Sequence, residues 1–430
     1  MNIREIAFNI IKKIYSEKKL ATEVYPFFLD RVEDERDKRL ILEIVYGVNR
    51  YKGRLEYVLS KFADKNRTEE NIWLLMLTGV YQLLFLTRTP VYAVIHQTVE
   101  IAKKKINPKV AGFVNATLKR IAKEKENITF PSRENLADYI QYTLSFPLFL
   151  GMKWIADYGE EKAIEIMKAL NMKKPVVFRC FKSVEPLKKE FIVHKTPYMN
   201  NAYYGNIPVY LIRAAQCYIM NESSQLAPEL LRNFKGETAF DAASSPGGKG
   251  FILKGFNNFQ NVILNDVSKE RIVKILENAN DLSLDIDALT LSDLTKPAFK
   301  NQSFDAIILD APCSGTGTIS GHPEIKWIRT PQSLKSKLTV QRKMLDNAFA
   351  MLKKGGVLVY SVCSMEKEEG ESMVARFIAS TEGARLLKPF EYAESEIANS
   401  FGKFESKKGW LRIIPDKFLD GFFIALIGKE

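Results

Sequence analysis

The chain of 430 residues has few of the residues that build disulfide frameworks or zinc sites, with four cysteines and three histidines. The cysteines (Cys180, Cys217, Cys313 and Cys363) show no short Cys-x-x-Cys spacing. A disulfide framework and a zinc-type Cys/His cluster are therefore not expected, and we predict a protein without a metal. Scarce, scattered cysteine is typical of a reducing compartment.

Long apolar runs are also missing. The most apolar stretch, residues 72–86, is shorter than the ~20 residues that cross a bilayer, and it contains Thr78 and Gln82. The N-terminus places Ile3, Ile6, Ala7, Ile10 and Ile14 on one helical face, which indicates an amphipathic helix and not a signal peptide. No internal repeat or low-complexity tract is visible. These absences predict a cytoplasmic protein without a membrane segment.

The chain has a net positive charge, and the whole of it comes from the first half. Residues 1–220 contain 36 Lys or Arg and 24 Asp or Glu, whereas residues 221–430 contain 27 of each, so that the net charge of +12 comes from the first half alone. A basic half joined to a neutral half is typical of a module that handles a polyanion. A solubilising surface is the alternative explanation.

The periodicity of apolar residues divides the chain into three predicted parts. Residues 1–130 are expected to be all helical, because apolar residues recur at a spacing of three and four in segments 40–48, 73–86, 91–106 and 110–121. Residues 131–218 mix two predicted helices with short extended runs at 176–181, 190–194 and 209–212, which indicates a small α+β linker module. The basic segments 103–109 and 119–125 of the first part are candidates for contact with a phosphate backbone.

From residue 219 to residue 430, short apolar runs alternate with segments of helical length. Strands are expected at 238–242, 262–265, 288–291, 306–309 and 357–360, followed by a closing hairpin from runs 411–414 and 422–427. This alternation predicts a doubly wound, Rossmann-like α/β domain.

Ligands of such sheets bind beyond the carboxyl ends of the strands. The residues that follow the first three predicted strands are suited to bind different parts of one ligand. The first strand leads into a loop of small residues, Ala243, Ser244, Ser245, Pro246, Gly247, Gly248 and Lys249, whose amides can approach a ligand closely. Its spacing fits neither the dinucleotide fingerprint nor the P-loop. Asp266 after the second strand suits the hydroxyls of a ribose, and Asp293 after the third suits an adenine amino group. Together these residues predict a pocket for an adenosine compound without phosphates, which indicates S-adenosylmethionine as the ligand.

The fourth and fifth strand ends each supply a cysteine. Asp310-Ala-Pro-Cys313 follows one strand, and Cys363 follows the next. A thiolate is a suitable nucleophile for addition to an electron-poor ring. The residues alone do not distinguish the roles of the two thiols.

These motifs resemble the Sun/Nop2 family of RNA cytosine-C5 methyltransferases. The resemblance rests on Ser245-Pro-Gly-Gly-Lys249, Asp310-Ala-Pro-Cys-Ser-Gly-Thr-Gly317, His322-Pro-Glu-Ile-Lys-Trp327, Tyr360-Ser-Val-Cys-Ser364 with Glu366, and Asp420-Gly-Phe-Phe-Ile-Ala. The helical part is similar to the RNA-binding NusB family through Tyr46-Gly-Val-Asn-Arg50, Gly79-Val-Tyr-Gln-Leu83 and Phe113-Val-Asn-Ala-Thr-Leu-Lys-Arg120. The resemblance covers nearly the whole chain.

The resemblance implies a methyltransferase that uses S-adenosylmethionine to modify C5 of a specific cytosine in small-subunit (16S) ribosomal RNA, as a monomer. It implies that Cys363 adds to C6 of the cytosine, that Cys313 assists proton removal and product release, and that Asp310 steadies the base. Residues 243–249, Asp266, Asp293 and Asp310 would hold the cofactor. His322 and Trp327 are interpreted as part of a loop on the RNA side.

Two positions depart from the family pattern. The cofactor loop has Ala243-Ser-Ser where the family has Cys-Ala-Ala, and Arg179-Cys-Phe181 lacks the Asn of the family's Arg-x-Asn.

Two functional alternatives remain. One alternative is an enzyme of the same chemistry that acts on another RNA, or a methyltransferase for DNA, a protein or a small molecule. The other is a non-catalytic RNA-binding protein of ribosome assembly or antitermination.

Overall fold

The computed structural model describes residues 2–430, which form two compact units. The first unit contains the chain up to Asn171 together with Gly321–Thr330, and the second contains Met172–Ser320 and Pro331–Glu430. This grouping differs from the three predicted parts. The first unit extends to residue 171, past the predicted boundary at residue 130, and a short segment from the predicted methyltransferase domain also packs in this unit.

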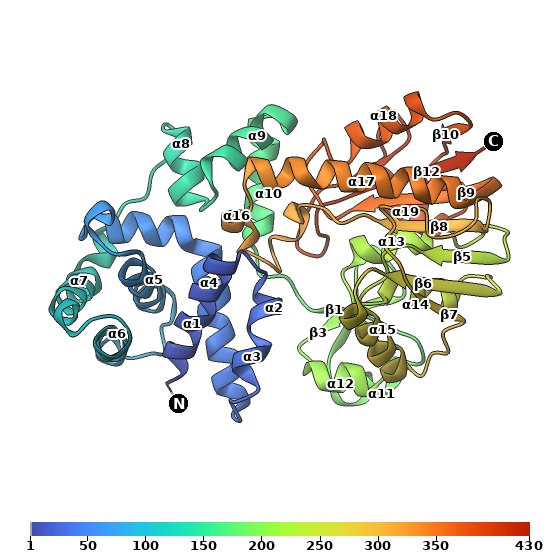
Figure 1. The fold of residues 1–430 in the computed structure, drawn as a ribbon. Helices are drawn as coiled ribbons and strands as arrows, with labels where there is room; N and C mark the ends of the chain where they lie inside the picture. Colours follow the sequence, from blue (N-terminus) through green and yellow to red (C-terminus); the bar gives the residue numbers. More distant parts are fainter. Residues whose placement is uncertain (1) are drawn as a thin grey trace. The chain divides into compact units, whose positions relative to one another are not determined.

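The first unit is all helical, as predicted for residues 1–130 (Figure 1). Its α-helices are α1 (Ile3–Glu17), α2 (Ala21–Val24), α3 (Pro26–Leu29), α4 (Glu35–Ser60), α5 (Glu70–Phe85), α6 (Val91–Lys105), α7 (Ala111–Glu124), α8 (Leu136–Asp138), α9 (Leu148–Tyr158), α10 (Glu160–Asn171) and α16 (Ile325–Ile328). Short 3-10 turns η1 (Lys65–Arg67), η2 (Pro108–Val110) and η3 (Lys125–Asn127) and a π-helical turn η4 (Tyr139–Thr143) connect them.

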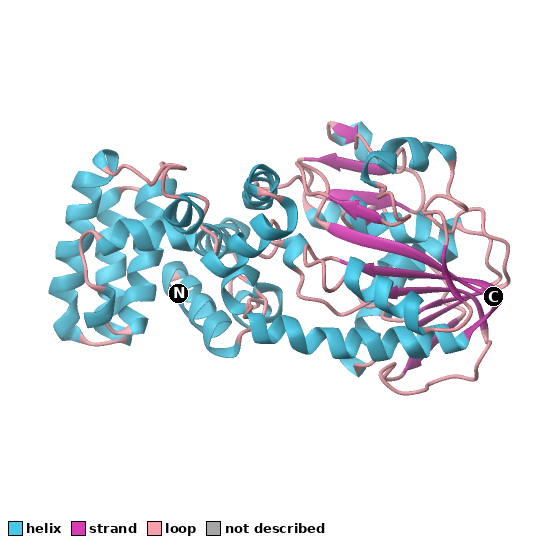
Figure 2. Cartoon of the chain, turned by 90° about the horizontal axis from the view of Figure 1, so that it is seen from above, coloured by secondary structure: helices cyan, strands magenta, loops and turns pink. Residues whose placement is uncertain are grey.

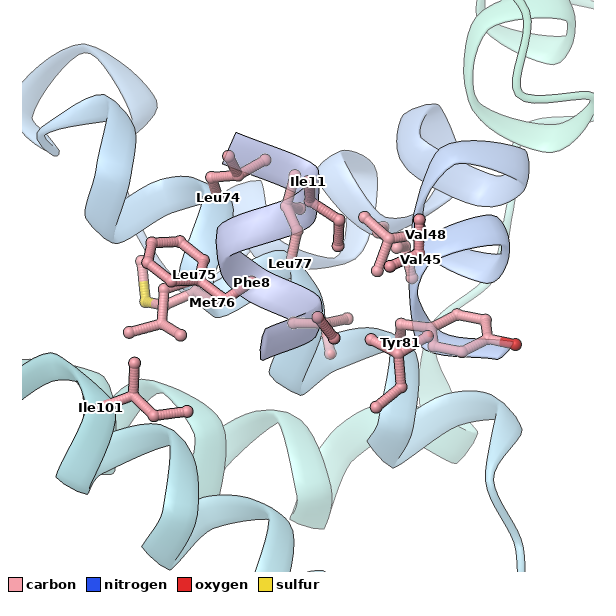
Figure 3. Close-up of a cluster of buried hydrophobic side chains, with 14 of the residues drawn as sticks. Phe8, Ile11, Val45, Val48, Leu74, Leu75, Met76, Leu77, Tyr81 and Ile101 are labelled. Carbon is pink, nitrogen blue, oxygen red and sulfur yellow. The ribbon is translucent and has the colours of Figure 1, made fainter. Parts of the chain in front are cut away.

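Helix α5 forms the centre of this unit, because it is apolar on nearly all sides and buried from Ile72 to Leu83. The amphipathic helix α1 packs its predicted isoleucine face here, and Asn2 caps its first turn by accepting from the backbone N–H of Arg4 at 3.0 Å. Figure 3 shows side chains of α1, α4, α5 and α6 meeting in this core. A core of this kind gives the helical unit its own hydrophobic stabilisation.

The second unit is built on a large mixed sheet of strand order β10-β12-β9-β8-β5-β6-β7, with β11 paired to β12. Its strands are β5 (Thr238–Asp241), β6 (Asn261–Asp266), β7 (Ala288–Leu291), β8 (Phe304–Asp310), β9 (Leu352–Val362), β10 (Ala384–Leu386), β11 (Leu411–Ile413) and β12 (Phe422–Lys429). Strands β5 to β9 are parallel neighbours, and β12 pairs antiparallel with β9. The five predicted strands and the closing hairpin are confirmed.

Helices cover both faces of this sheet, so the domain is Rossmann-like as predicted (Figure 2). One face packs against α13 (Glu222–Glu229), α14 (Gly248–Phe256), α15 (Lys269–Leu282) and α19 (Ser395–Phe401). The other packs against α17 (Pro331–Met351) and α18 (Glu371–Ser380). Alternate residues of each strand enter the two cores: Ile307 lies in one, and Ala306 and Ile308 in the other. The 3-10 turns η5 (Thr316–Thr318) and η6 (Gly402–Phe404) lie in connections.

The second unit also contains the small α+β module. Its antiparallel sheet has the order β2-β3-β1-β4, from β1 (Val177–Cys180), β2 (Val193–Lys195), β3 (Ala202–Gly205) and β4 (Cys217–Ile219), with helices α11 (Glu185–Glu190) and α12 (Val209–Ala214). The predicted extended run at 209–212 is wrong, since these residues form α12. A four-residue apolar run does not distinguish a strand from one turn of buried helix.

The two cysteines of this module correct a second expectation. Cys180 of β1 lies opposite Cys217 of β4 in the antiparallel register, and the two form a disulfide. They are 37 residues apart in the chain, so the sequence spacing gave no indication of the pair. Cys313 and Cys363 are free thiols. Across residues 2–430, no helix is both long and apolar enough to cross a membrane.

Candidate functional site

The residues predicted to bind a cofactor lie at the carboxyl ends of β5, β6 and β7. The loop of small residues 243–249 joins β5 to α14, and its Gly247 adopts a left-handed φ of 111°. A Cβ atom at Gly247 would lie 2.1 Å from the Phe251 ring, so only glycine fits there. The Ser244 hydroxyl, one of the departures from the family loop, donates to Asp241 at 2.9 Å.

Asp266 ends β6 with its side chain 4% exposed. Its carboxylate accepts from the backbone N–H groups of Val267 at 2.8 Å, of Ser245 at 3.3 Å and of Ser268 at 3.3 Å. These contacts fix the carboxylate at the strand end, beside the loop of small residues. Asp293 lies just beyond β7, where the Thr295 hydroxyl and N–H donate to its carboxylate and lower its pKa.

Asn265, which connects these loops, has no role predicted from the sequence. Its side-chain amide donates to the carbonyl of Ala242 at 3.0 Å and accepts from Ser292 at 2.6 Å. Nor is a role predicted for Val267 and Leu291, large apolar side chains that are 59% and 58% exposed at the ends of β6 and β7. Exposed apolar side chains at the ends of two neighbouring strands offer surface for an aromatic ring. Their position at the predicted strand ends is the sequence signal that could have identified them.

The structure brings the two predicted catalytic thiols together. Cys313 follows β8 and Cys363 follows β9, and their Sγ atoms are 3.3 Å apart. Both residues are half-buried. The hydrogen bond with Cys363 and burial raise the pKa of the Cys313 thiol well above its usual range, and the negative charges of Glu369 and Asp310 add to this. Cys313 is therefore a neutral thiol near neutral pH.

Asp310, at the end of β8, forms an ion pair with Lys249 from the loop of small residues, with Nζ and Oδ2 2.5 Å apart. Its other oxygen accepts from the Ser361 hydroxyl at 2.9 Å. Burial alone would lower the pKa of Lys249, but the charges of Asp310, Asp241 and Cys363 outweigh it and raise that pKa. An ammonium group thus lies within the electrostatic reach of the Cys363 sulfur. The sequence placed Lys249 only among the cofactor residues.

Glu369 lies beneath the thiols and holds the loop that carries Cys313. This role of Glu369 was not predicted from the sequence. Its side chain is almost fully buried, with the residue 1% exposed. Oε1 accepts from the backbone N–H of Ser314 at 2.9 Å and from the Gln341 amide at 3.1 Å, and Oε2 accepts from the Ser314 hydroxyl at 2.5 Å. Gln341 also donates to the carbonyl of Pro312 at 3.2 Å, so that both neighbours of Cys313 are held.

The loop that carries Cys363 joins the same network. The Ser364 hydroxyl lies 3.0 Å from that of Ser314, and the Tyr360 hydroxyl donates to the carbonyl of Glu369 at 2.8 Å. The Thr316 hydroxyl donates to Glu366, a residue quoted in the family motif, at 3.2 Å. Buried hydrogen-bond networks of this kind fix loop geometry.

The predicted RNA-side loop lies in the helical unit, within segment 321–330. The Trp327 indole donates to the carbonyl of Asn49 at 2.6 Å, and the buried Lys326 donates to the carbonyl of Arg50 at 2.7 Å. Burial lowers the pKa of Lys326 well below its usual range, with the charge of Arg50 adding to the effect. These contacts give Lys326 and Trp327 a packing role in the helical unit.

Arg179 begins the segment Arg179-Cys-Phe181, which lacks the Asn of the family's Arg-x-Asn. The Arg179 side chain is buried, with the residue 1% exposed. Its guanidinium forms an ion pair with the buried Glu229 and lies 4.1 Å from the centre of the Phe256 ring. Arg179 thus joins the small module to the large sheet's helices within the second unit. A guanidinium this deeply buried serves packing and not direct contact with RNA.

Comparisons with known proteins agree with this architecture. Residues 228–428 match the family model described as 16S rRNA methyltransferase RsmB/F, and residues 1–123 match the NusB family. The chain is 27% identical to ribosomal RNA small subunit methyltransferase B of Vibrio vulnificus over all of both chains. It is 28% identical to probable ribosomal RNA small subunit methyltransferase B of Bacillus subtilis, over 100% of this chain and 99% of that one.

Solved structures share the fold. The crystal structure of PH0851 has a TM-score of 0.79 at 20% identity and covers 100% of this chain and 99% of its own. A methyltransferase homologue from Pyrococcus horikoshii has a TM-score of 0.55 at 28% identity, over 67% of this chain and 97% of its own.

Proposed function

Because residues 228–428 belong to the RsmB/F family of 16S rRNA methyltransferases and residues 1–123 to the NusB family, we propose that the chain methylates C5 of a cytosine in small-subunit ribosomal RNA. The observation that carries the proposal is the pair of thiols 3.3 Å apart at the ends of β8 and β9, beside a loop that suits a cofactor. A protein that only bound RNA would have no use for this pair.

The strand ends fit S-adenosylmethionine as the cofactor, which when bound supplies an electrophilic methyl group. Asp266 presents a fixed carboxylate for the two ribose hydroxyls, and Asp293 lies where it can accept from the adenine amino group. Val267 and Leu291 offer apolar surface to the faces of the adenine ring. The backbone of loop 243–249 and Asp310 complete the cofactor residues.

We assign the nucleophile to Cys363. Its sulfur adds to C6 of the cytosine, which makes C5 nucleophilic enough to accept the methyl group. The Lys249 ammonium interacts electrostatically with the Cys363 sulfur, whereas the raised pKa of Cys313 keeps that thiol neutral. This difference in electrostatics supports the division of roles that the family resemblance implies.

Cys313 then assists removal of the proton from C5, after which the bond between C6 and the Cys363 sulfur breaks and releases the product. The Cys313 thiol first gives its own proton to solvent, and because its pKa is raised the resulting thiolate is a strong base that takes the proton from C5. Asp310, fixed by Lys249 and Ser361, presents a carboxylate that steadies the cytosine beside the two thiols.

The test is transfer of labelled methyl from S-adenosylmethionine to unmodified small-subunit ribosomal RNA, followed by nucleoside analysis. The proposal expects label in 5-methylcytidine with the wild-type protein and none with Cys363→Ala. Label in another nucleoside, or full activity of Cys363→Ala, would refute the assignment. Duplex DNA and protein from the assembled subunit serve as alternative acceptors in the same assay.

A further inference from the structure

The small α+β module carries a disproportionate share of the positive charge. Residues 171–220 contain eight Lys or Arg and two Glu, an excess of six that equals half of the chain's net charge of +12. Two of the eight are paired within the second unit, since Lys174 binds Asp420 and Arg179 binds Glu229. The remaining excess belongs to side chains on the surface of the module.

Two helices that cover the same face of the small sheet carry three of these surface cations, Lys188, Lys189 and Arg213, and two acids, Glu185 and Glu190, so their own net charge is +1. Leu187 of α11 and Ile212 of α12 enter one small core with Phe178 of β1, and Figure 1 shows the two helices next to each other. We define the α11–α12 surface as four exposed residues of these helices, Lys188, Lys189, Tyr210 and Arg213, together with the exposed Lys182, three residues before α11. Glu185, the acidic residue of α11's first turn, is paired with Lys188 at 2.7 Å.

Tyr210 distinguishes this surface from a merely solubilising one. It is 69% exposed, and its neighbour Val209 is 45% exposed, although both begin a helix whose other side is well buried. Tyr210 and Arg213 are three residues apart, and therefore adjacent on the outer side of α12. An exposed aromatic ring among cations is the combination that binds single-stranded nucleic acid, by base stacking and phosphate contacts.

The module that carries this surface contacts the cofactor loop. Strand β4 follows α12 directly, and its Tyr218 hydroxyl donates to the carbonyl of Pro246 at 3.2 Å. Gln216, between α12 and β4, donates to the Ser283 hydroxyl at the end of α15 at 2.6 Å. The disulfide between Cys180 and Cys217 fastens β4 to β1. The module is thus fixed to the domain that holds the two thiols.

We propose that the α11–α12 surface binds a single-stranded segment of the substrate RNA next to the target cytosine. This inference rests on the proposed function and deepens it. Lys182, Lys188, Lys189 and Arg213 contact phosphates, and Tyr210 stacks on an unpaired base. The surface therefore contributes to RNA affinity and to the KM for RNA, and leaves the chemistry at the thiols unchanged.

Binding is tested first, because it does not require catalysis. The probe is a short single-stranded oligocytidylate, and retention on a filter is measured against salt concentration. Lys189→Glu/Arg213→Glu, with one change from each helix, should weaken binding about tenfold or more and reduce the slope of log affinity against log salt by about 1.4, the value for two lost phosphate contacts. The matched control is Lys407→Glu/Lys408→Glu, the same charge change at two exposed lysines of the same unit, and its affinity should stay within twofold.

Tyr210 is tested by two substitutions. Tyr210→Ala should weaken binding about tenfold, and Tyr210→Phe should leave it unchanged, because stacking needs the ring and not the hydroxyl. Unchanged affinity for S-adenosylmethionine shows that each variant is folded. Equal affinities of the two charge-reversal variants, or equal affinities of Tyr210→Ala and wild type, would overturn the proposal.

Methyl transfer separates this proposal from the proposed function. With unmodified small-subunit ribosomal RNA, Lys189→Glu/Arg213→Glu should raise KM about tenfold and leave kcat within twofold. A defect confined to RNA already assembled with proteins would mean that the surface binds a protein, which overturns the proposal. A wild-type protein that binds RNA through this surface without transferring methyl would refute the proposed function alone.

Discussion

Replacing Glu369 removes the group that holds the Cys313 loop, and the contacts allow the cost to be worked out. Its carboxylate accepts two hydrogen bonds from Ser314 and one from Gln341. Glu369→Ala leaves the buried Ser314 N–H without its acceptor, at about 1–3 kcal/mol, and loses hydrogen bonds to a charged group. In the variant, the Ser314 hydroxyl still contacts that of Ser364, and the Gln341 amide still donates to the carbonyl of Pro312. We therefore expect Glu369→Ala to lower the free energy of unfolding by about 3–5 kcal/mol.

Glu369→Gln keeps the shape and removes only the charge, so it should cost about 1–2 kcal/mol. Urea unfolding of the full chain measures both variants, and Glu382→Ala, at an exposed position of the same unit, is the control with little expected change. Because the charge of Glu369 raises the pKa of Cys313, Glu369→Gln should also lower that pKa. Alkylation rates against pH, with Cys363→Ala in both proteins, measure this shift. An unchanged Cys313 pKa, or a Glu369→Ala variant as stable as Glu382→Ala, would refute the reasoning.

Two further predictions concern charges elsewhere in the second unit. Burial raises the pKa of Glu222 from 4.5 to about 7, with Asp416 adding to the effect and the hydrogen bond from Thr196 opposing it. The folded state then binds this proton more tightly than the unfolded state, so stability should fall by about 3 kcal/mol as pH rises from about 4.5 to 7. Glu222→Gln should remove this part of the pH dependence of urea unfolding, and an unchanged slope would contradict the cause given. Lys249→Met should lower kcat for methyl transfer by about 10²–10³-fold, because it removes the positive charge beside the Cys363 sulfur and the ion-pair partner of Asp310. A kcat within twofold of the wild-type value would contradict this role of Lys249.

The large sheet and its site could be predicted because local signals coincide with it. Buried parallel strands such as β8 and β9 appear as apolar runs of strand length, and polar residues at their ends must meet at one edge. These signals predict from the sequence alone that Cys313 and Cys363 lie near each other. The amphipathic face of α1 was equally visible, because its isoleucines follow the helical period.

The contacts that were missed depend on tertiary packing. The disulfide partner of Cys180 follows from the register of β1 and β4, which are far apart in the chain. Glu369 looks like one acid in a charged run, and only burial against Ser314 and Gln341 shows its role. Segment 321–330 carries no signal that it packs with the helical unit, since its contacts are to carbonyl groups of residues such as Arg50.

The most direct test of the two cysteine roles is a denaturing gel of each variant incubated with labelled small-subunit ribosomal RNA and S-adenosylmethionine. We expect a shifted protein–RNA band with Cys313→Ala, because Cys363 can add to the base and release is blocked. No shifted band is expected with Cys363→Ala or with the double variant. A shifted band with Cys363→Ala that disappears in the double variant would contradict the account and make Cys313 the nucleophile.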